Sequence, residues 1–144
     1  MCNRLIGIDD FESLIEMAVK AGDTSGVDLL FKDYYALEQH QKQSKEKDDF
    51  VCISLANIAQ MTPEQVKSVN KEKLARSLLQ LIAFNIAEVA FLYAKLYKVD
   101  KALFTGNFIL NKKVTQIFIM EAFNYFVETM NYNCRVVYSL LVSF

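Results

Sequence analysis

Residues 102–111 read ALFTGNFILN, and this stretch decides how the chain is expected to fold. A short apolar run stops abruptly at Gly106-Asn107 and is followed by a helical pattern. In an open α/β sheet, ligands collect where strands end and helices begin, because glycine lets the backbone come close and a helix N-terminus offers free N–H groups. The stretch is therefore this chain's best candidate for a nucleotide contact.

The residues that follow complete a strand, helix and strand pattern. The spacing predicts a strand over 102–105, a helix over 112–130 and a second strand over 134–138. The apolar side chains expected to face inward from that helix are Val114, Ile117, Phe118 and Tyr125. Such a βαβ unit should be right-handed, with its two strands parallel.

These two runs are the convincing strands in the sequence, and that raises a difficulty. A parallel sheet is stable when both faces are covered and several strands share the ladder. Two strands alone leave open edges and make a poor α/β core. We therefore expect the chain to be part of a larger domain.

The N-terminal part reads as a helical hairpin. Asp9-Asp10-Phe11-Glu12 resembles a capping box with Asp in the Ser/Thr place, and Gly22 closes the helix that follows. Ser25 is expected to cap a second helix, whose apolar residues Val27, Leu30, Phe31 and Tyr34 have helical spacing. The turn GDTS would join the two helices within the first 38 residues.

The middle of the chain predicts three more helices. Residues 50–61 are one apolar helix candidate, and Thr62-Pro63-Glu64-Gln65 begins the next. Asn70 should cap a long helix over 71–98. Its apolar residues cover two adjoining faces, so we expect this helix to be buried on most sides. They are Leu74, Leu78, Leu81, Val89, Leu92 and Leu96 on one face, and Leu79, Ile82, Ile86 and Tyr93 on the other.

Residues 39–49 read QHQKQSKEKDD and contain no apolar residue. Because such a segment cannot pack, we expect a polar loop exposed to solvent. The single histidine, His40, lies inside it and has no Cys or other His nearby in the sequence. We therefore interpret His40 as exposed to solvent and assign it no catalytic role.

Charge and cysteine content exclude several classes of protein. With 16 Lys and Arg against 17 Asp and Glu, the net charge of −1 offers no field for nucleic acid or an acidic membrane. Cys2, Cys52 and Cys134 match no disulfide framework and no metal-ligand spacing. No apolar core of signal-peptide length opens the chain, so free thiols in the cytoplasm are expected.

Residues 78–96 form the longest apolar segment, and polar residues interrupt it. They are Gln80, Asn85, Glu88 and Lys95. That many polar groups favour a buried helix over a membrane span.

Three motifs together resemble the eukaryotic-type (type II) pantothenate kinases. FESLIEMAVKAGD followed by VDLLFKDYY is similar to the family's F-E-x-x-x-E-M-A helix, G-D turn and V-D-x-L-V-x-D-I-Y. SVNKEKLARSLLQLIAFNIAEVA is similar to its S-V-S-K-E-D-L-A-R-A-T-L stretch and N-I-G-x-x-A continuation. ALFTGNFILN is close to its V-F-V-G-N-F-L-R-x-N. The three matches occur in the family's order across about residues 5 to 130.

The resemblance implies a fold and an activity. The family has the two-lobed α/β fold of actin, sugar kinases and heat-shock chaperones, and residues 1–144 would be a partial C-terminal, ATP-side lobe. The matching enzymes phosphorylate pantothenate with ATP and Mg²⁺, the first step toward coenzyme A. They act as homodimers that acyl-coenzyme A inhibits.

By resemblance, site residues can be carried over at two places. Gly106 and Asn107 fall on the family's G-N turn, which implies a nucleotide contact there, with Thr105 beside them. Asn57 falls near a family segment A-[SN]-F-G on the substrate or dimer side, although Ile58-Ala59 replace the Phe-Gly.

The departures from the family pattern matter as much. The glycine-rich phosphate loop, the glutamate base and the substrate-gripping arginine and serines of the other lobe have no counterpart here. The sequence therefore predicts a kinase fragment without catalytic residues, inactive alone. The alternative is a non-catalytic module that pairs with a full-length kinase through its helical surface. A metal or redox protein is not expected, because the sequence offers no ligand set.

Overall fold

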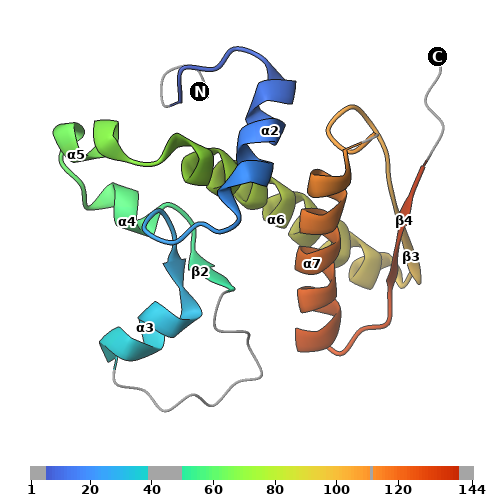
Figure 1. Ribbon diagram of the computed structural model, residues 1–144. Helices are drawn as coiled ribbons and strands as arrows, with labels where there is room; N and C mark the ends of the chain where they lie inside the picture. The colour runs from blue at the N-terminus through green and yellow to red at the C-terminus, as the bar shows by residue number, and fades with distance from the viewer. Residues whose placement is uncertain (1–5, 39–49, 111, 140–144) are drawn as a thin grey trace. The chain divides into compact units, whose positions relative to one another are not determined.

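The computed structural model describes residues 6–38, 50–110 and 112–139 (Figure 1). The chain forms two compact units, unit 1 over residues 1–78 and unit 2 over residues 79–144. The predicted polar loop over 39–49, including His40, lies outside the described residues.

Unit 1 begins with helix α2, Phe11–Ala21. Its N-cap is Asp10, whose Oδ1 accepts a hydrogen bond from the Ser13 backbone N–H at 2.8 Å. The cap therefore lies one residue after the position that the Asp9–Glu12 spacing predicted. Gly22 ends the helix with a φ of +72°, as expected of a C-terminal glycine.

The expected helical hairpin is wrong between Ser25 and Leu30. This segment instead contains strand β1, Leu29–Leu30, and helix α3 begins only at Phe31, spanning Phe31–Glu38. β1 pairs antiparallel with β2, Val51–Ile53. The spacing of the apolar residues fits a helix, but over so short a run it fits a buried strand equally well.

The helix predicted over 50–61 is likewise wrong over its first part. Strand β2 occupies Val51–Ile53, and helix α4 is limited to Ala56–Ala59. Leu55 precedes α4 in a left-handed conformation, with a φ of +59°. The described residues therefore contain four strands in two small sheets, two strands more than the sequence predicted.

The predicted start signals of the next two helices are confirmed. Thr62 and Gln65 form the capping box of α5, Pro63–Ser68, with Pro at its start. α6 is Lys71–Tyr97 and runs from unit 1 into unit 2. The Oδ1 of Asn70 accepts hydrogen bonds from the backbone N–H groups of Glu72 and Lys73, at 2.8 and 3.1 Å.

The expectation that α6 is buried on most sides is wrong. Within unit 2 its buried face is narrow and consists mainly of alanine, while Val89, Leu92 and Leu96 are exposed. By length and composition alone α6 could cross a membrane, with a mean hydropathy of 1.6 in a window that is 39% buried. That is weak evidence for a span, because core helices of soluble proteins meet the same criterion.

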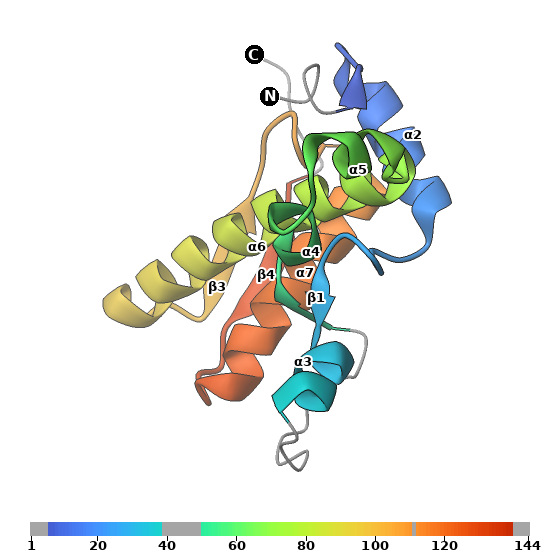
Figure 2. The ribbon, with the colours of Figure 1, turned by 90° about the vertical axis from the view of Figure 1, so that its left-hand side faces the viewer.

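The βαβ prediction is confirmed in unit 2. Strand β3 is Lys101–Phe104, α7 is Lys113–Thr129 and β4 is Arg135–Tyr138. β3 and β4 pair in parallel, with Ala102 opposite Val136 and Phe104 opposite Tyr138. In Figures 1 and 2, the two-stranded ribbon of β3 and β4 runs beside α7.

Aromatic rings hold unit 2 together. Phe91 of α6 and Phe123 of α7 are both fully buried, with ring centroids 5.6 Å apart. Phe123 also meets Phe104 of β3 at 5.9 Å, and Phe126 stacks on Phe91 at 5.8 Å. Phe118 is buried as expected, but Ile117 is exposed, because the buried face of α7 is turned slightly from the predicted one.

Candidate functional site

The turn formed by Thr105, Gly106 and Asn107, here called the Gly106 corner, lies where strand β3 ends. Phe104 is buried, Gly106 is half-buried, and Thr105 and Asn107 on either side of it are exposed. Gly106 has a φ of +104°, which L side chains rarely adopt. A Cβ built at this glycine would meet no atom within 4 Å. The corner is therefore open to the surroundings.

Hydrogen bonds fix the shape of this corner. The Gly106 carbonyl accepts from the backbone N–H groups of Ile109 and Leu110, at 3.0 and 2.9 Å, which makes one helical turn. The Thr115 Oγ1 donates to the Phe108 carbonyl at 2.6 Å. The Gln116 Nε2 donates to the Ile109 carbonyl at 3.0 Å. The loop is thereby tied to the first turn of α7.

The tyrosine of β4 strengthens the same end of the unit. The Tyr138 hydroxyl donates to the Gln116 carbonyl at 2.6 Å. Burial raises the pKa of Tyr138 to about 12, so this donor keeps its proton at neutral pH. The Gly106 corner thus has a fixed backbone beyond the end of a parallel strand, with the Thr105 hydroxyl and the Asn107 amide exposed beside it. This geometry is suited to a polar ligand.

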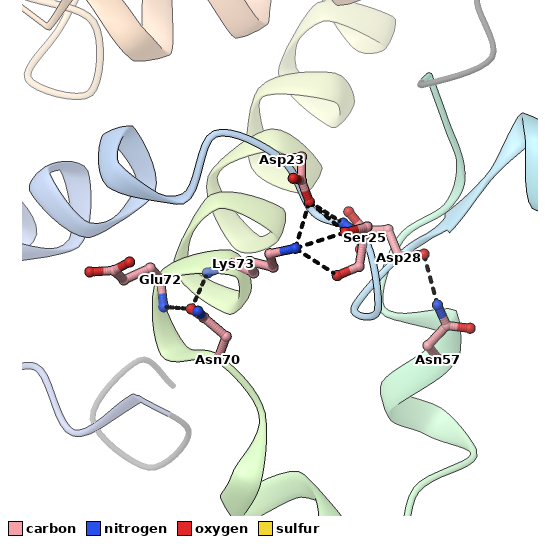
Figure 3. Close-up of polar contacts among 7 residues, drawn as sticks. All are labelled: Asp23, Ser25, Asp28, Asn57, Asn70, Glu72 and Lys73. Carbon is pink, nitrogen blue, oxygen red and sulfur yellow. Dashed lines mark hydrogen bonds and ion pairs between the residues drawn. The ribbon is translucent and has the colours of Figure 1, made fainter.

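Asn57, the second predicted site residue, takes part in a polar cluster of unit 1 (Figure 3). Its Nδ2 donates to the Asp28 carbonyl at 2.9 Å, and its backbone N–H donates to the Val27 carbonyl at 3.2 Å. Both groups therefore join α4 to the segment before β1. Asn57 lies in unit 1, whereas Thr105, Gly106 and Asn107 lie in unit 2.

Asp28 is the centre of this cluster, and sequence reasoning missed it. The residue is fully buried. Its Oδ1 accepts from the Leu55 backbone N–H at 2.7 Å and from the Ser77 hydroxyl at 2.5 Å. Its Oδ2 is buried and has no hydrogen-bond partner among the described residues. An Asp among apolar residues, at a position predicted as helix, was the available signal.

A second polar group surrounds Lys73, near the N-terminus of α6 (Figure 3). The Lys73 Nζ lies 2.8 Å from the Asp23 Oδ1 and 2.7 Å from the Ser25 Oγ. The Ser25 hydroxyl donates to the same Asp23 oxygen at 2.6 Å. The hydrogen bond from Lys73, followed by those from Ser25, holds the pKa of Asp23 well below its usual range. The Lys73 ammonium and the Asp23 carboxylate therefore neutralise each other as an ion pair.

An open hollow of about 420 Å³ lies beside Lys73. Its lining is mixed in character and belongs wholly to unit 1: Ser25, Gly26, Val27, Met61, Gln65, Ser68, Val69, Asn70 and Lys73. Gln65 and Asn70 already serve as helix caps, and the Ser68 hydroxyl donates to the Gln65 carbonyl. The polar side chains of the lining are therefore already engaged in hydrogen bonds within unit 1.

Within the described residues, no group of three or more His, Cys, Asp or Glu side chains is placed to hold a metal ion. Cys52 is half-buried and Cys134 is buried. Burial raises the pKa of the Cys134 thiol, which disfavours the reactive thiolate.

Comparison with known proteins gives the chain a family. The family model described as Fumble matches residues 1–135. A 4'-phosphopantetheine phosphatase of Mus musculus is 33% identical over 116 residues, covering 81% of this chain and 13% of that protein. The pantothenate kinase of Schizosaccharomyces pombe is 27% identical over 124 residues, covering 85% and 30%.

A third relative is pantothenate kinase 2 of Oryza sativa subsp. japonica, 26% identical over 121 residues, covering 80% of this chain and 12% of that protein. The chain thus spans less than a third of the length of these relatives. The resemblance drawn from the three sequence motifs is confirmed, and the chain belongs to the Fumble family, the family of the pantothenate kinases.

Proposed function

We propose that this chain forms part of the ATP site of a pantothenate kinase, and that the Gly106 corner contacts the nucleotide. The observation that carries the proposal is the open Gly106 at the end of a parallel strand, flanked by exposed Thr105 and Asn107. Nucleotides bind at such strand ends because the backbone can approach them closely. Family membership supports ATP as the nucleotide.

The proposal assigns the chain a partial role in the reaction. The four glycines of the sequence are scattered, so the chain offers no glycine-rich loop to cradle phosphates. We place ATP with Mg²⁺, pantothenate, acyl-coenzyme A and homodimer formation in the whole kinase, in a lobe of the actin type. By itself the chain is proposed to transfer no phosphoryl group.

A chimera tests the nucleotide contact. This chain would replace the matching segment of 124 residues in the S. pombe kinase, and KM would be measured for ATP and for pantothenate separately. Gly106→Val adds a branched side chain where the nucleotide is proposed to lie. It should raise KM for ATP about tenfold and leave KM for pantothenate unchanged.

Gly22→Val is the matched control, because Gly22 also has a positive φ and open space around it. It imposes similar backbone strain in unit 1, away from the proposed contact. An unchanged KM for ATP in Gly106→Val, or an equal rise in Gly22→Val, would remove the assignment. The binding of a fluorescent ATP analogue gives the same readout if the chimera turns over slowly.

A further inference from the structure

A series of hydrogen bonds leads from strand β4 to the Gly106 corner. The Tyr138 hydroxyl donates to the Gln116 carbonyl at 2.6 Å, and the Gln116 Nε2 donates to the Ile109 carbonyl at 3.0 Å. The Ile109 backbone N–H in turn donates to the Gly106 carbonyl at 3.0 Å. We call these three bonds the Tyr138 relay. All four residues lie in unit 2.

The same tyrosine also contacts the strand on the other side of the corner. The Tyr138 ring lies beside the ring of Phe104, with centroids 6.1 Å apart, and the two residues are opposite each other in the parallel ladder. The Ser139 backbone N–H donates to the Phe104 carbonyl at 3.1 Å. Phe104 directly precedes Thr105. Tyr138 therefore contacts the strand before the Gly106 corner through its ring and the helix after it through its hydroxyl.

These contacts matter because glycine does not fix its own conformation. Gly106 has a φ of +104°, and a Cβ built there would meet no atom within 4 Å. Since glycine adopts many backbone conformations, neighbouring residues must select this one. A backbone that is fixed before its ligand arrives loses less conformational entropy on binding, and so binds more tightly.

We propose that Tyr138 and Gln116 are positioning residues for the nucleotide, because their relay holds the Gly106 corner in the conformation that the nucleotide contacts. The inference rests on the proposed function and adds to it two residues outside the corner. They act through Ile109, whose side chain is buried and whose backbone bonds to both Gln116 and Gly106.

A tyrosine that only stabilises unit 2 would behave differently. Its loss would lower the free energy of unfolding but leave KM for ATP unchanged in the folded protein. Tyr132 provides this comparison, because its hydroxyl donates to the carbonyls of Ala94 and Val99 at 3.3 and 3.0 Å, before the start of β3. Tyr138→Phe and Tyr132→Phe each remove one hydroxyl from unit 2 and keep the ring.

Amide hydrogen exchange in the 144-residue chain tests the relay. The backbone N–H groups of Ile109 and Leu110 both donate to the Gly106 carbonyl, so their exchange rates report how often the corner opens. In Tyr138→Phe these two groups should exchange about tenfold faster, because one hydrogen bond of the relay is lost. In Tyr132→Phe they should exchange as in the wild type. Equal rates in Tyr138→Phe and the wild type would overturn the inference.

The S. pombe chimera tests the positioning role. Tyr138→Phe and Gln116→Met, which keeps the side-chain length but removes the donor, should each raise KM for ATP about fivefold. KM for pantothenate should stay unchanged, and Tyr132→Phe should alter neither value. Because both residues act through one relay, the double variant should also show a rise of about fivefold rather than the product of the two effects. Independent, multiplying effects would contradict the relay.

Comparison with Gly106→Val separates this inference from the proposed function. If Gly106→Val raises KM for ATP and Tyr138→Phe does not, the positioning role is wrong and the nucleotide contact stands. If neither variant changes KM for ATP while Tyr138→Phe still speeds exchange at Ile109, the nucleotide contact itself is wrong, and the positioning role is lost with it.

Discussion

Units 1 and 2 are built on different principles. Among the described residues, unit 1 buries a carboxylate and two hydroxyls, those of Asp28, Thr24 and Ser77, whereas unit 2 buries one hydroxyl, that of Thr115. In unit 2 four aromatic rings meet at the junction of α6, α7 and β3. Apolar packing tolerates small shifts, whereas a buried carboxylate requires each donor in place. The stability of unit 2 should therefore depend on the volume of its buried side chains, and the stability of unit 1 on its buried hydrogen bonds.

The largest effect is expected in the aromatic core of unit 2. Phe123→Ala removes a fully buried ring that contacts Phe91 and Phe104, and should lower the free energy of unfolding by about 3 to 5 kcal/mol. Urea denaturation followed by circular dichroism measures it. Met120→Ala, at an exposed position of α7, is the control and should cost less than about 1 kcal/mol.

The next effect concerns the buried carboxylate of unit 1. Asp28→Ala leaves the Leu55 N–H and the Ser77 hydroxyl without their acceptor, which should cost about 2 to 3 kcal/mol of unfolding free energy. Asp28→Asn keeps one acceptor oxygen and should cost about 1 kcal/mol. If Asp28→Leu were as stable as the wild type, the contrast between the two units would fail.

A smaller effect is expected at the Gly106 corner. Gly106→Ala should lower the free energy of unfolding by about 1 kcal/mol, because alanine is strained at a φ of +104° although nothing crowds it. Thermal unfolding of the chain measures this. A loss as large as that of Phe123→Ala would mean that the corner is packed rather than open.

The smallest effect belongs to the exposed ion pair of unit 1. The folded state lowers the pKa of Asp23 below its ordinary 3.8, so the stability that Asp23 contributes is present at neutral pH and is lost as pH falls below about 4. Asp23→Asn should cost less than about 1 kcal/mol at pH 7, because the pair is exposed. Unfolding free energies of both proteins, measured across that pH range, should converge in acid. A constant difference would exclude the carboxylate's charge as the cause.

The sequence predicted unit 2 better than unit 1, and the reason is physical. The βαβ order, the parallel pairing and the position of Gly106 followed from long periodic segments and a turn signal. Helix starts at Thr62 and Asn70 followed from capping residues. Local patterns suffice where local interactions decide the structure.

Segments 25–30 and 50–55 were predicted as helix because their apolar spacing allows it. What decides them is non-local: Asp28 receives bonds from Leu55 and from Ser77, and β1 pairs with β2 across the polar segment. The exposed face of α6 was missed for a related reason. Periodicity identifies apolar faces but does not say which one finds a partner within the chain. For the site, the sequence predicted the place of the Gly106 corner but not the hydrogen bonds from Thr115 and Gln116 that fix its shape.

The most direct test of the nucleotide contact is photolabelling of the S. pombe chimera with an azido-adenine analogue of ATP, followed by mass spectrometry of its peptides. We expect a label on the peptide that contains Thr105, Gly106 and Asn107, and its loss when unmodified ATP is added in excess. A label competed by ATP that falls entirely on other peptides would contradict the nucleotide contact.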